Sequence, residues 1–249
     1  MVSSINVDSP RPAHPTPRIV GIGASAGGLV ALEQFLSQTP LDSMMAYIVV
    51  QHLDPTHKAL LPELLQRFTT MPVREAKHDM RIEPDHVYVI PPNTELSVVD
   101  DRLKLAKPAV PRGMRLPVNV LFSSLSSAQG DRAIAVILSG MGSDGTLGMQ
   151  AIKAVGGLNV VQDPNTAQFD SMPKSAISAG CAEIVAPANE LPARILSYVA
   201  QVSLPETSTD AETASATAPL QNIIKLLQQR TRHDFTLYKK STLNRRIER

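Results

Sequence analysis

Tryptophan is absent from this chain of 249 residues, and only 4% of its residues are aromatic. That scarcity argues against a carbohydrate-binding face or a platform for single-stranded nucleic acid, because both depend on exposed aromatic rings. The 24 basic residues are nearly balanced by 23 acidic ones, which leaves a formal net charge of +1. Because no strong positive field is available to attract phosphates, we expect no nucleic acid as a partner.

Cysteine occurs only at position 181, so an internal disulfide is excluded and Cys181 is expected to be a buried small hydrophobe. No apolar run approaches the roughly 20 residues that a membrane-spanning helix needs, and the first residues lack the apolar core of a signal peptide. We therefore expect a cytoplasmic protein without membrane insertion. No group of His, Cys and carboxylate residues has the spacing of metal ligands, so neither a metal nor another cofactor is expected.

What the chain does have, from Arg18 to about Val199, is an alternation of short apolar runs with amphipathic segments, which is typical of βαβ units. Strands are expected before Ser25 and at Met45–Gln51, Pro72–Glu75, His86–Ile90, Glu95–Val99, Leu103–Ala106, Ala133–Ser139, Leu158–Gln162 and Ala182–Val185. Helices are expected at Leu29–Leu36, Lys58–Arg67, Val118–Ser127, Leu147–Val155, Pro173–Ala179 and Leu191–Val199. The pattern predicts an α/β fold, a doubly wound, mostly parallel, Rossmann-like sheet with a β-hairpin.

Composition changes at both ends of this region. Residues 1–17 are polar and broken by proline, and we expect a disordered leader. Residues 200–219 are rich in Thr, Ser, Ala and acidic residues, which is typical of a linker. Residues 220–249 begin with helical apolar spacing and become basic, so a short helical extension follows a main domain at 18–199.

The stretch RIVGIGASAGGL carries Ser25 inside a G-x-S-x-G motif, where an apolar strand turns into a helix. Small neighbours relieve crowding at such a turn, and the following helix directs its positive end at the same spot. Ser25 is therefore a candidate nucleophile. Two other interpretations stay open: a surface serine in a tight turn, and a phosphate-binding loop, because Gly21, Gly23 and Gly27 approximate a dinucleotide-binding loop.

His52 and Asp144 follow two other apolar strands. Because loops at the carboxyl ends of parallel strands share one edge of the sheet, we predict that Ser25, His52 and Asp144 converge as nucleophile, base and orienting acid. His52 could instead cap the next segment, and Asp144 could cap the following helix. The order Ser, His, Asp differs from the Ser, acid, His order of α/β-hydrolases. A nucleotide-binding sheet would favour an acidic residue where Gln51 and His52 end the second strand.

At these motifs the chain resembles the chemotaxis receptor-glutamate methylesterase family (CheB) over roughly Arg18–Val199. The resemblance rests on GIGASAGG, VVQHLDP, VYVIPPN, ILSGMGSDGTLG and VVQDPNTAQFDSMPKSAI, in that order. It implies a Ser-His-Asp esterase on a doubly wound parallel sheet. Such an enzyme removes methyl groups from glutamyl esters on the cytoplasmic helices of chemotaxis receptors, its expected partners, and often deamidates glutamines there.

The same resemblance implies that Ser25 is the nucleophile, His52 the base and Asp144 the orienting acid. It further implies that the backbone N–H of Met141 helps to bind the oxyanion, with Gly142 and Ala26 lining the site. A substrate helix needs a groove, which we predict along the strand-end edge between Pro91–Asn93 and the loop from Gln162 to Met172. Its expected contacts are Asn93, Gln168 and Met172.

Two features depart from the full-length family pattern. Only a short leader precedes the first strand, so we expect no regulation by a preceding receiver domain within this chain. The tail, with HDFTLYKKSTLNRRI, resembles the opening of the receptor methyltransferase family (CheR) and stops before a methyl-donor site, which suggests the front of a fused methylesterase–methyltransferase. The tail could instead be a basic amphipathic segment that binds acidic partners. A non-catalytic module that docks on a receptor or kinase is the alternative function.

Overall fold

The computed structural model describes residues 17–51, 60–111 and 114–203. The chain divides into two compact units, residues 1–194 and 195–249, and the second is described only over residues 195–203. The expected leader up to residue 16, the linker beyond residue 203 and the extension at 220–249 lie outside the described residues, as does His52.

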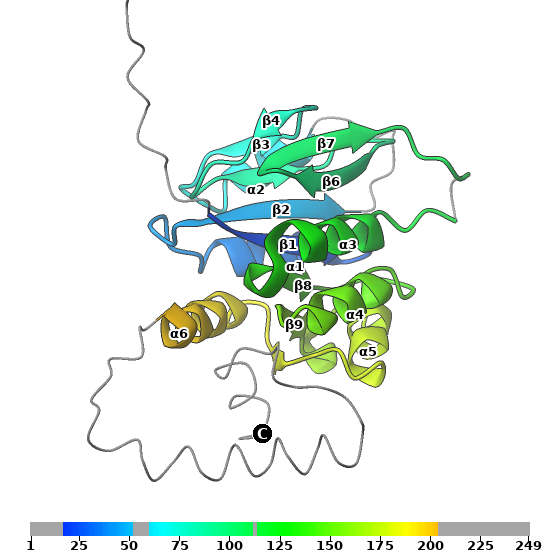
Figure 1. Cartoon of the computed structure of the whole chain (residues 1–249). Helices are drawn as coiled ribbons and strands as arrows, with labels where there is room; N and C mark the ends of the chain where they lie inside the picture. Colours follow the sequence, from blue (N-terminus) through cyan, green and yellow to red (C-terminus); the bar gives the residue numbers. More distant parts are fainter. Residues whose placement is uncertain (1–16, 52–59, 112–113, 204–249) are drawn as a thin grey trace, which may run out of the picture. The chain divides into compact units, whose positions relative to one another are not determined.

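A seven-stranded sheet forms the centre of the first unit, in the order β10-β9-β8-β1-β2-β5-β3. Figure 1 shows β9, β8, β1 and β2 following one another across it. All of its pairings are parallel. Its strands are β1 (Arg18–Ala24), β2 (Met45–Gln51), β3 (Val73–Glu75), β5 (Val87–Val89), β8 (Ile134–Ile137), β9 (Leu158–Gln162) and β10 (Ile184–Ala186). The predicted parallel sheet is confirmed. Strand β8 ends two residues before the predicted Ser139, whose N–H donates to the side chain of Gln162 in β9 instead of to a backbone carbonyl.

A second, antiparallel sheet has the order β4-β7-β6, formed by β4 (Met80–Arg81), β6 (Glu95–Val99) and β7 (Arg102–Ala106). The hairpin of β6 and β7 was expected and is confirmed. Asp100 and Asp101 join the two strands with φ of 48° and 58°. Positive φ at both central residues suits a two-residue hairpin turn, and Asp tolerates this conformation better than most residues.

Helices cover both faces of the main sheet, as the doubly wound prediction requires. Along β2, Ile48 belongs to the same buried cluster as Phe122 of α3 (Pro117–Gln129), whereas the Tyr47 ring meets Phe35 of α1 (Gly28–Leu36) edge-on at 6.4 Å between centroids. Successive strand residues point to opposite faces, so α3 and α1 lie on opposite sides. The helices are α1 (Gly28–Leu36), α2 (Leu60–Gln66), α3 (Pro117–Gln129), α4 (Thr146–Ala154), α5 (Ser171–Ser178) and α6 (Leu191–Ser203). Within the described ranges, none is long and apolar enough to cross a membrane.

The order of the strands reverses between β1 and β8. Beyond β1 the sheet continues through β2, β5 and β3 on one side, and beyond β8 it continues through β9 and β10 on the other. Loops that leave the carboxyl ends of β1 and β8 therefore diverge to opposite faces, and this switch point is where ligands bind in sheets of this kind. The turn with Ser25 follows β1, and the turn from Ser139 to Gly142 follows β8.

Candidate active site

Ser25 occupies the turn between β1 and α1 and is partly exposed. Its N–H donates to the carbonyl of Ser139 at 3.0 Å, and its own carbonyl accepts from the N–H of Gly28 at 2.9 Å. The first bond ties the turn to the end of β8, and the second leads into α1. The strand-turn-helix context that the G-x-S-x-G motif predicts is therefore present, with Ser25 in front of helix N–H groups that favour negative charge.

Gly27 completes this turn in a left-handed conformation, with φ of 69°. A Cβ at this position would lie 2.7 Å from Oγ of Ser139 and 2.8 Å from Oε1 of Gln168. Only glycine suits both the dihedral angle and the contact. The exposed Gln168, named above as a groove residue, thus lies directly against the turn that carries Ser25.

The turn after β8 lies against Ser25. A Cβ at Gly140 would be 3.1 Å from the Cβ of Ser25. The Gly140 N–H donates to the Phe169 carbonyl at 2.9 Å, and its carbonyl accepts from the Met172 N–H at 3.0 Å. Met141, the expected oxyanion donor, follows and is 61% exposed. Next comes Gly142, with φ of 85° and open space where a Cβ would point, so this turn is held at Gly140 and open to solvent beyond it.

Asp144 lies in the same loop and is 4% exposed. One carboxylate oxygen accepts from the N–H of Val118 at 3.0 Å, and the other accepts from the N–H of Asn119 at 2.9 Å. Both donors belong to the first turn of α3, whose orphan N–H groups and dipole suit a carboxylate. The side chain is thereby held in one orientation at the carboxyl end of β8, next to β1 in the sheet.

The alternative role considered for Asp144, a cap on the following helix, does not hold. The N-cap of α4 is Gly145, which has no side-chain cap bond. Asp144 instead closes the start of α3, a helix that lies earlier in the chain. Asn119 extends this link, because its Oδ1 accepts from the N–H of Gly148 in α4 at 2.9 Å.

Two polar residues that sequence reasoning did not select also lie at the strand ends. Ser139 follows β8 and Gln162 ends β9, and each is 1% exposed. Gln162 Oε1 accepts from the Ser139 N–H at 2.9 Å, and the Ser139 hydroxyl lies 2.9 Å from the carbonyl of Ala26. The backbone of Ala26 is therefore tied to Ser139. The signal that could have found both residues is a polar side chain at the end of an otherwise apolar strand.

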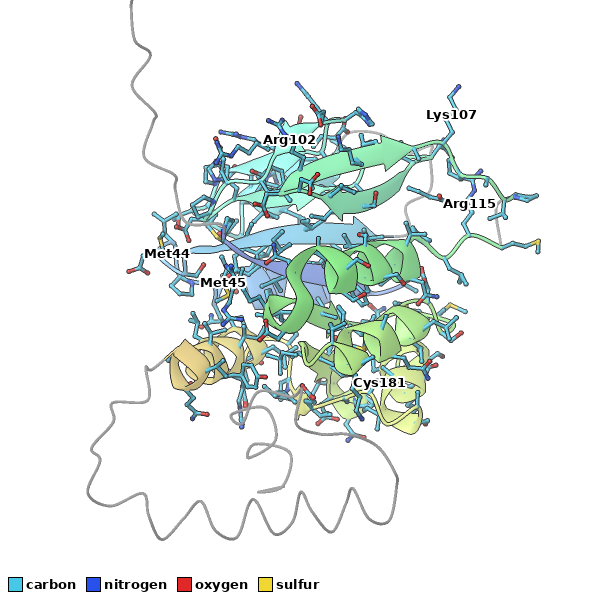
Figure 2. All side chains as sticks on the ribbon, viewed as in Figure 1. Met44, Met45, Arg102, Lys107, Arg115 and Cys181 are labelled. Atoms are coloured by element: carbon cyan, nitrogen blue, oxygen red, sulfur yellow. The ribbon has the colours of Figure 1, made fainter. Side chains whose placement is uncertain are left out.

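The predicted groove residues differ in their placement. Asn93, with φ of 55°, follows β5 at the strand-end edge, and its Oδ1 is 3.4 Å from Nη1 of Arg115. Arg115 and Lys107 lie on the side toward which the strands of the main sheet point (Figure 2). The prediction that Met172 contacts the substrate is corrected. Its side chain is 1% exposed and packs against Gly140, so it supports the turn from within the fold and does not line a groove.

Cys181 is the single thiol of the chain. Cys181 (Figure 2) is buried, and this burial raises the pKa of its thiol against the opposing effect of Lys153, which disfavours the reactive thiolate. Within the described ranges, no three His, Cys, Asp or Glu side chains are placed to hold a metal ion. The last described residue of β2 is Gln51, which pairs with Ala24. The predicted base His52 lies outside the described residues.

The fold and these residues define a doubly wound α/β protein that presents a serine at the switch point of its sheet. Its residues 20–195 match the CheB methylesterase family, and the chain belongs to that family. The fold is similar to the crystal structure of the Thermotoga maritima CheB methylesterase catalytic domain, with a TM-score of 0.69 and 30% identity. The match covers 73% of this chain and 98% of that one.

Curated relatives support the same membership. A protein-glutamate methylesterase/protein-glutamine glutaminase of Thiobacillus denitrificans is 35% identical over 193 residues, which cover 76% of this chain and 54% of the relative. One from Pseudomonas aeruginosa is 34% identical over 198 residues, which cover 78% and 56%. The chain thus spans about half the length of the curated relatives it matches. Residues 218–249 match the all-alpha domain of CheR methyltransferase, which confirms the predicted second family.

Proposed function

We propose that this domain is a serine hydrolase that cleaves glutamyl methyl esters on cytoplasmic helices of chemotaxis receptors and deamidates glutamines at equivalent positions. Family membership and the names of the relatives support the reaction class. The observation that carries the proposal is the position of Ser25 at the switch point, with Gly140 against its Cβ. A nucleophile and a turn suited to binding an oxyanion then lie side by side.

In the proposed mechanism, the Ser25 hydroxyl attacks the ester carbonyl carbon while His52 takes its proton. The Met141 N–H and the start of α1 stabilise the negative charge on the carbonyl oxygen. His52 then protonates the departing methoxide, so methanol leaves and an acyl-serine remains. Water, deprotonated by the same base, releases the glutamate carboxylate and restores Ser25. Asp144 orients the imidazole, a role supported by the two N–H donors that fix its carboxylate.

We further propose that the receptor helix lies along the strand-end edge between Asn93 and Gln168, in the cytoplasm. Gln168 lies against the turn of Ser25, and Asn93 lies at the end of β5, two strands from β1. Adjacent strands are about 5 Å apart, so this edge spans the width of one helix, about 10 Å. Charge changes at Asn93 and Gln168 test the placement, because they should raise KM and leave kcat nearly unchanged.

The test of the reaction is methanol release from a methylated receptor cytoplasmic fragment. We expect Ser25→Ala to lower kcat by about 10³-fold or more, the usual effect of losing one member of such a unit. Ser37→Ala, at an exposed serine that ends α1, is the matched control and should match the wild type. Equal methanol release from Ser25→Ala and wild type would overturn the esterase. A wild type that binds the fragment but releases no methanol would favour the docking module.

A further inference from the structure

Ser139 lies where three parts of the site meet: the turn that carries Ser25, the turn that begins at Gly140, and the loop that ends at Phe169. It is 1% exposed, and neither the G-x-S-x-G motif nor the predicted triad includes it. We propose that Ser139, held by Gln162, is a positioning residue that fixes Ser25 relative to the Met141 amide. The inference rests on the proposed function and assigns a further residue to that reaction.

The peptide group between Ser139 and Gly140 is bonded at both ends. Its carbonyl accepts from the Ser25 N–H at 3.0 Å, and its N–H donates to the Phe169 carbonyl at 2.9 Å. A peptide group is planar, so these two bonds fix the orientation from which the chain enters the next peptide, the one that carries the Met141 N–H. That next peptide is bonded as well, because the Gly140 carbonyl accepts from the Met172 N–H at 3.0 Å, so the proposed oxyanion donor is held relative to Ser139.

The Ser139 hydroxyl joins the other side of the nucleophile turn. It donates to the Ala26 carbonyl at 2.9 Å and accepts from the Phe169 N–H at 3.0 Å. One hydroxyl proton and one lone pair account for both bonds. Backbone groups on both sides of the Ser25 side chain, its own N–H and the carbonyl of the next residue Ala26, are therefore bonded to one buried residue.

Gln162 holds Ser139 from the neighbouring strand. Its Oε1 accepts from the Ser139 N–H at 2.9 Å, and its Nε2 donates to the Thr166 carbonyl at 3.2 Å. The side chain is 1% exposed, so these bonds are shielded from competing water. All hydrogen-bonding groups of Ser139 thus have partners within the site loops, and the residue has little freedom to move independently of Ser25.

A small displacement here matters for catalysis. Oxyanion donors work at 2.7–3.1 Å from the developing charge, and a shift of about 1 Å lowers rates by roughly 10²-fold. Ser139→Ala removes the hydroxyl that joins Ala26 to Phe169, so the Ala26 carbonyl and the Phe169 N–H lose this shared partner. We therefore expect loss of transition-state geometry with little change in substrate binding.

The experiment compares Ser139→Ala with Ser126→Ala, both in the 249-residue chain. Ser126 is a serine of α3 that is 8% exposed and donates within its helix, to the Ser123 carbonyl at 2.8 Å. Methanol release from the methylated receptor fragment gives kcat and KM. The rate of labelling by a small serine-directed phosphonate measures the reactivity of Ser25 independently of binding of the receptor helix. For Ser139→Ala we expect kcat and the labelling rate to fall about 10–100-fold, with KM within about threefold. Ser126→Ala should leave all three unchanged.

Ser139→Thr, which keeps the hydroxyl, should recover most of kcat if it folds. If Ser139→Ala does not fold, as judged by circular dichroism, Gln162→Met takes its place and should lower kcat and labelling together by about tenfold or less. Rates within about twofold of the wild type for a folded variant, or a rise in KM alone, would overturn the inference. If the proposed function itself fails, the wild type releases no methanol and forms no adduct, which is a different result.

Discussion

Gly140 shows how little space surrounds the candidate nucleophile. It lies between the side chain of Met172 on one side and Ser25 on the other, and its own φ is not in the left-handed region. Its requirement for glycine is therefore one of packing. Small displacements of this backbone would be felt directly by the serine, since no intervening side chain can absorb them.

Replacing Gly140 with alanine should reduce both stability and activity. The new methyl group would overlap Sδ of Met172 and approach Cβ of Ser25 to 3.1 Å, so one of them must move. Overpacking of this kind costs about 1–3 kcal/mol, and displacement of Ser25 should lower kcat by about 10-fold or more. Thermal unfolding and methanol release measure the two effects.

The control is Gly130→Ala. Gly130 also borders a helix, has φ of 56° and has open space where a Cβ would point. Alanine there should cost about 1–3 kcal/mol of backbone strain, because φ of 56° with ψ of −127° is rare for other residues, and should leave kcat unchanged. A Gly140→Ala chain with the kcat of Gly130→Ala would contradict the steric account of the site.

At the scale of elements, α3 links the small sheet to the site. Its first turn holds Asp144, and in its middle the Ser124 hydroxyl accepts from the Val98 N–H of β6 at 3.0 Å. At its start, Val118 fills the space beside Gly23 of β1. The helix α3 thus fixes the Asp144 carboxylate, covers the central strand β1 and supplies a hydrogen-bond acceptor to β6 of the hairpin.

Tyr47 of β2 is buried where α1 packs on the sheet, and its burial makes the free energy of unfolding depend on pH in the alkaline range. Tyr47 is 2% exposed, and its hydroxyl donates to Ser43 at 3.0 Å. Burial raises the pKa of Tyr47 to about 12, and the nearby Asp85 acts in the same direction. The unfolded chain releases this proton near pH 10, so the stability that Tyr47 contributes is present below pH 10 and is lost as the pH rises toward 12.

Tyr47→Phe should remove that part of the pH dependence. Between pH 9 and pH 11 we expect the free energy of unfolding to fall by about 1 kcal/mol more in the wild type than in the variant. Urea unfolding at both pH values measures it. Tyr88, whose pKa burial also raises, is present in both chains and so cancels in the comparison. Equal losses in the two chains would contradict the assignment to Tyr47.

Strands with long apolar runs could be predicted from the sequence, whereas contacts between distant elements could not. MAYIVVQ and LNVVQ gave the bounds of β2 and β9 correctly because their composition specifies a buried parallel strand. β4 was missed because two residues cannot show an alternating pattern. The Ser25 turn was predicted from its motif. That Asp144 would be held by α3 was not predictable, because it depends on how two helices pack.

At the scale of the whole molecule, every described residue of the candidate site lies between β1 and α5. The solved catalytic domain from Thermotoga maritima matches this chain over 98% of its own length, so a domain of that extent forms a structure by itself. We therefore expect a chain that ends after Ser203 to fold and to keep kcat within about twofold of the full chain.

Circular dichroism, thermal unfolding and methanol release on the shortened and full chains test this expectation. A large loss of kcat with the melting temperature unchanged would show that residues 204–249 contribute to the reaction. Loss of folding would show that they contribute to stability.

The neighbouring positions of β1 and β8 have a consequence for synthesis on the ribosome. Val20 of β1 pairs with Ile134 of β8, which is synthesised more than 100 residues later, whereas the other neighbour of β1, strand β2, is synthesised early. Such non-local pairing slows folding because a long segment must be brought back before the contact forms. A nascent chain released as far as β7 would possess its serine and lack β8, the strand on the other side of the switch point, so activity should emerge only in the final third of translation of this domain.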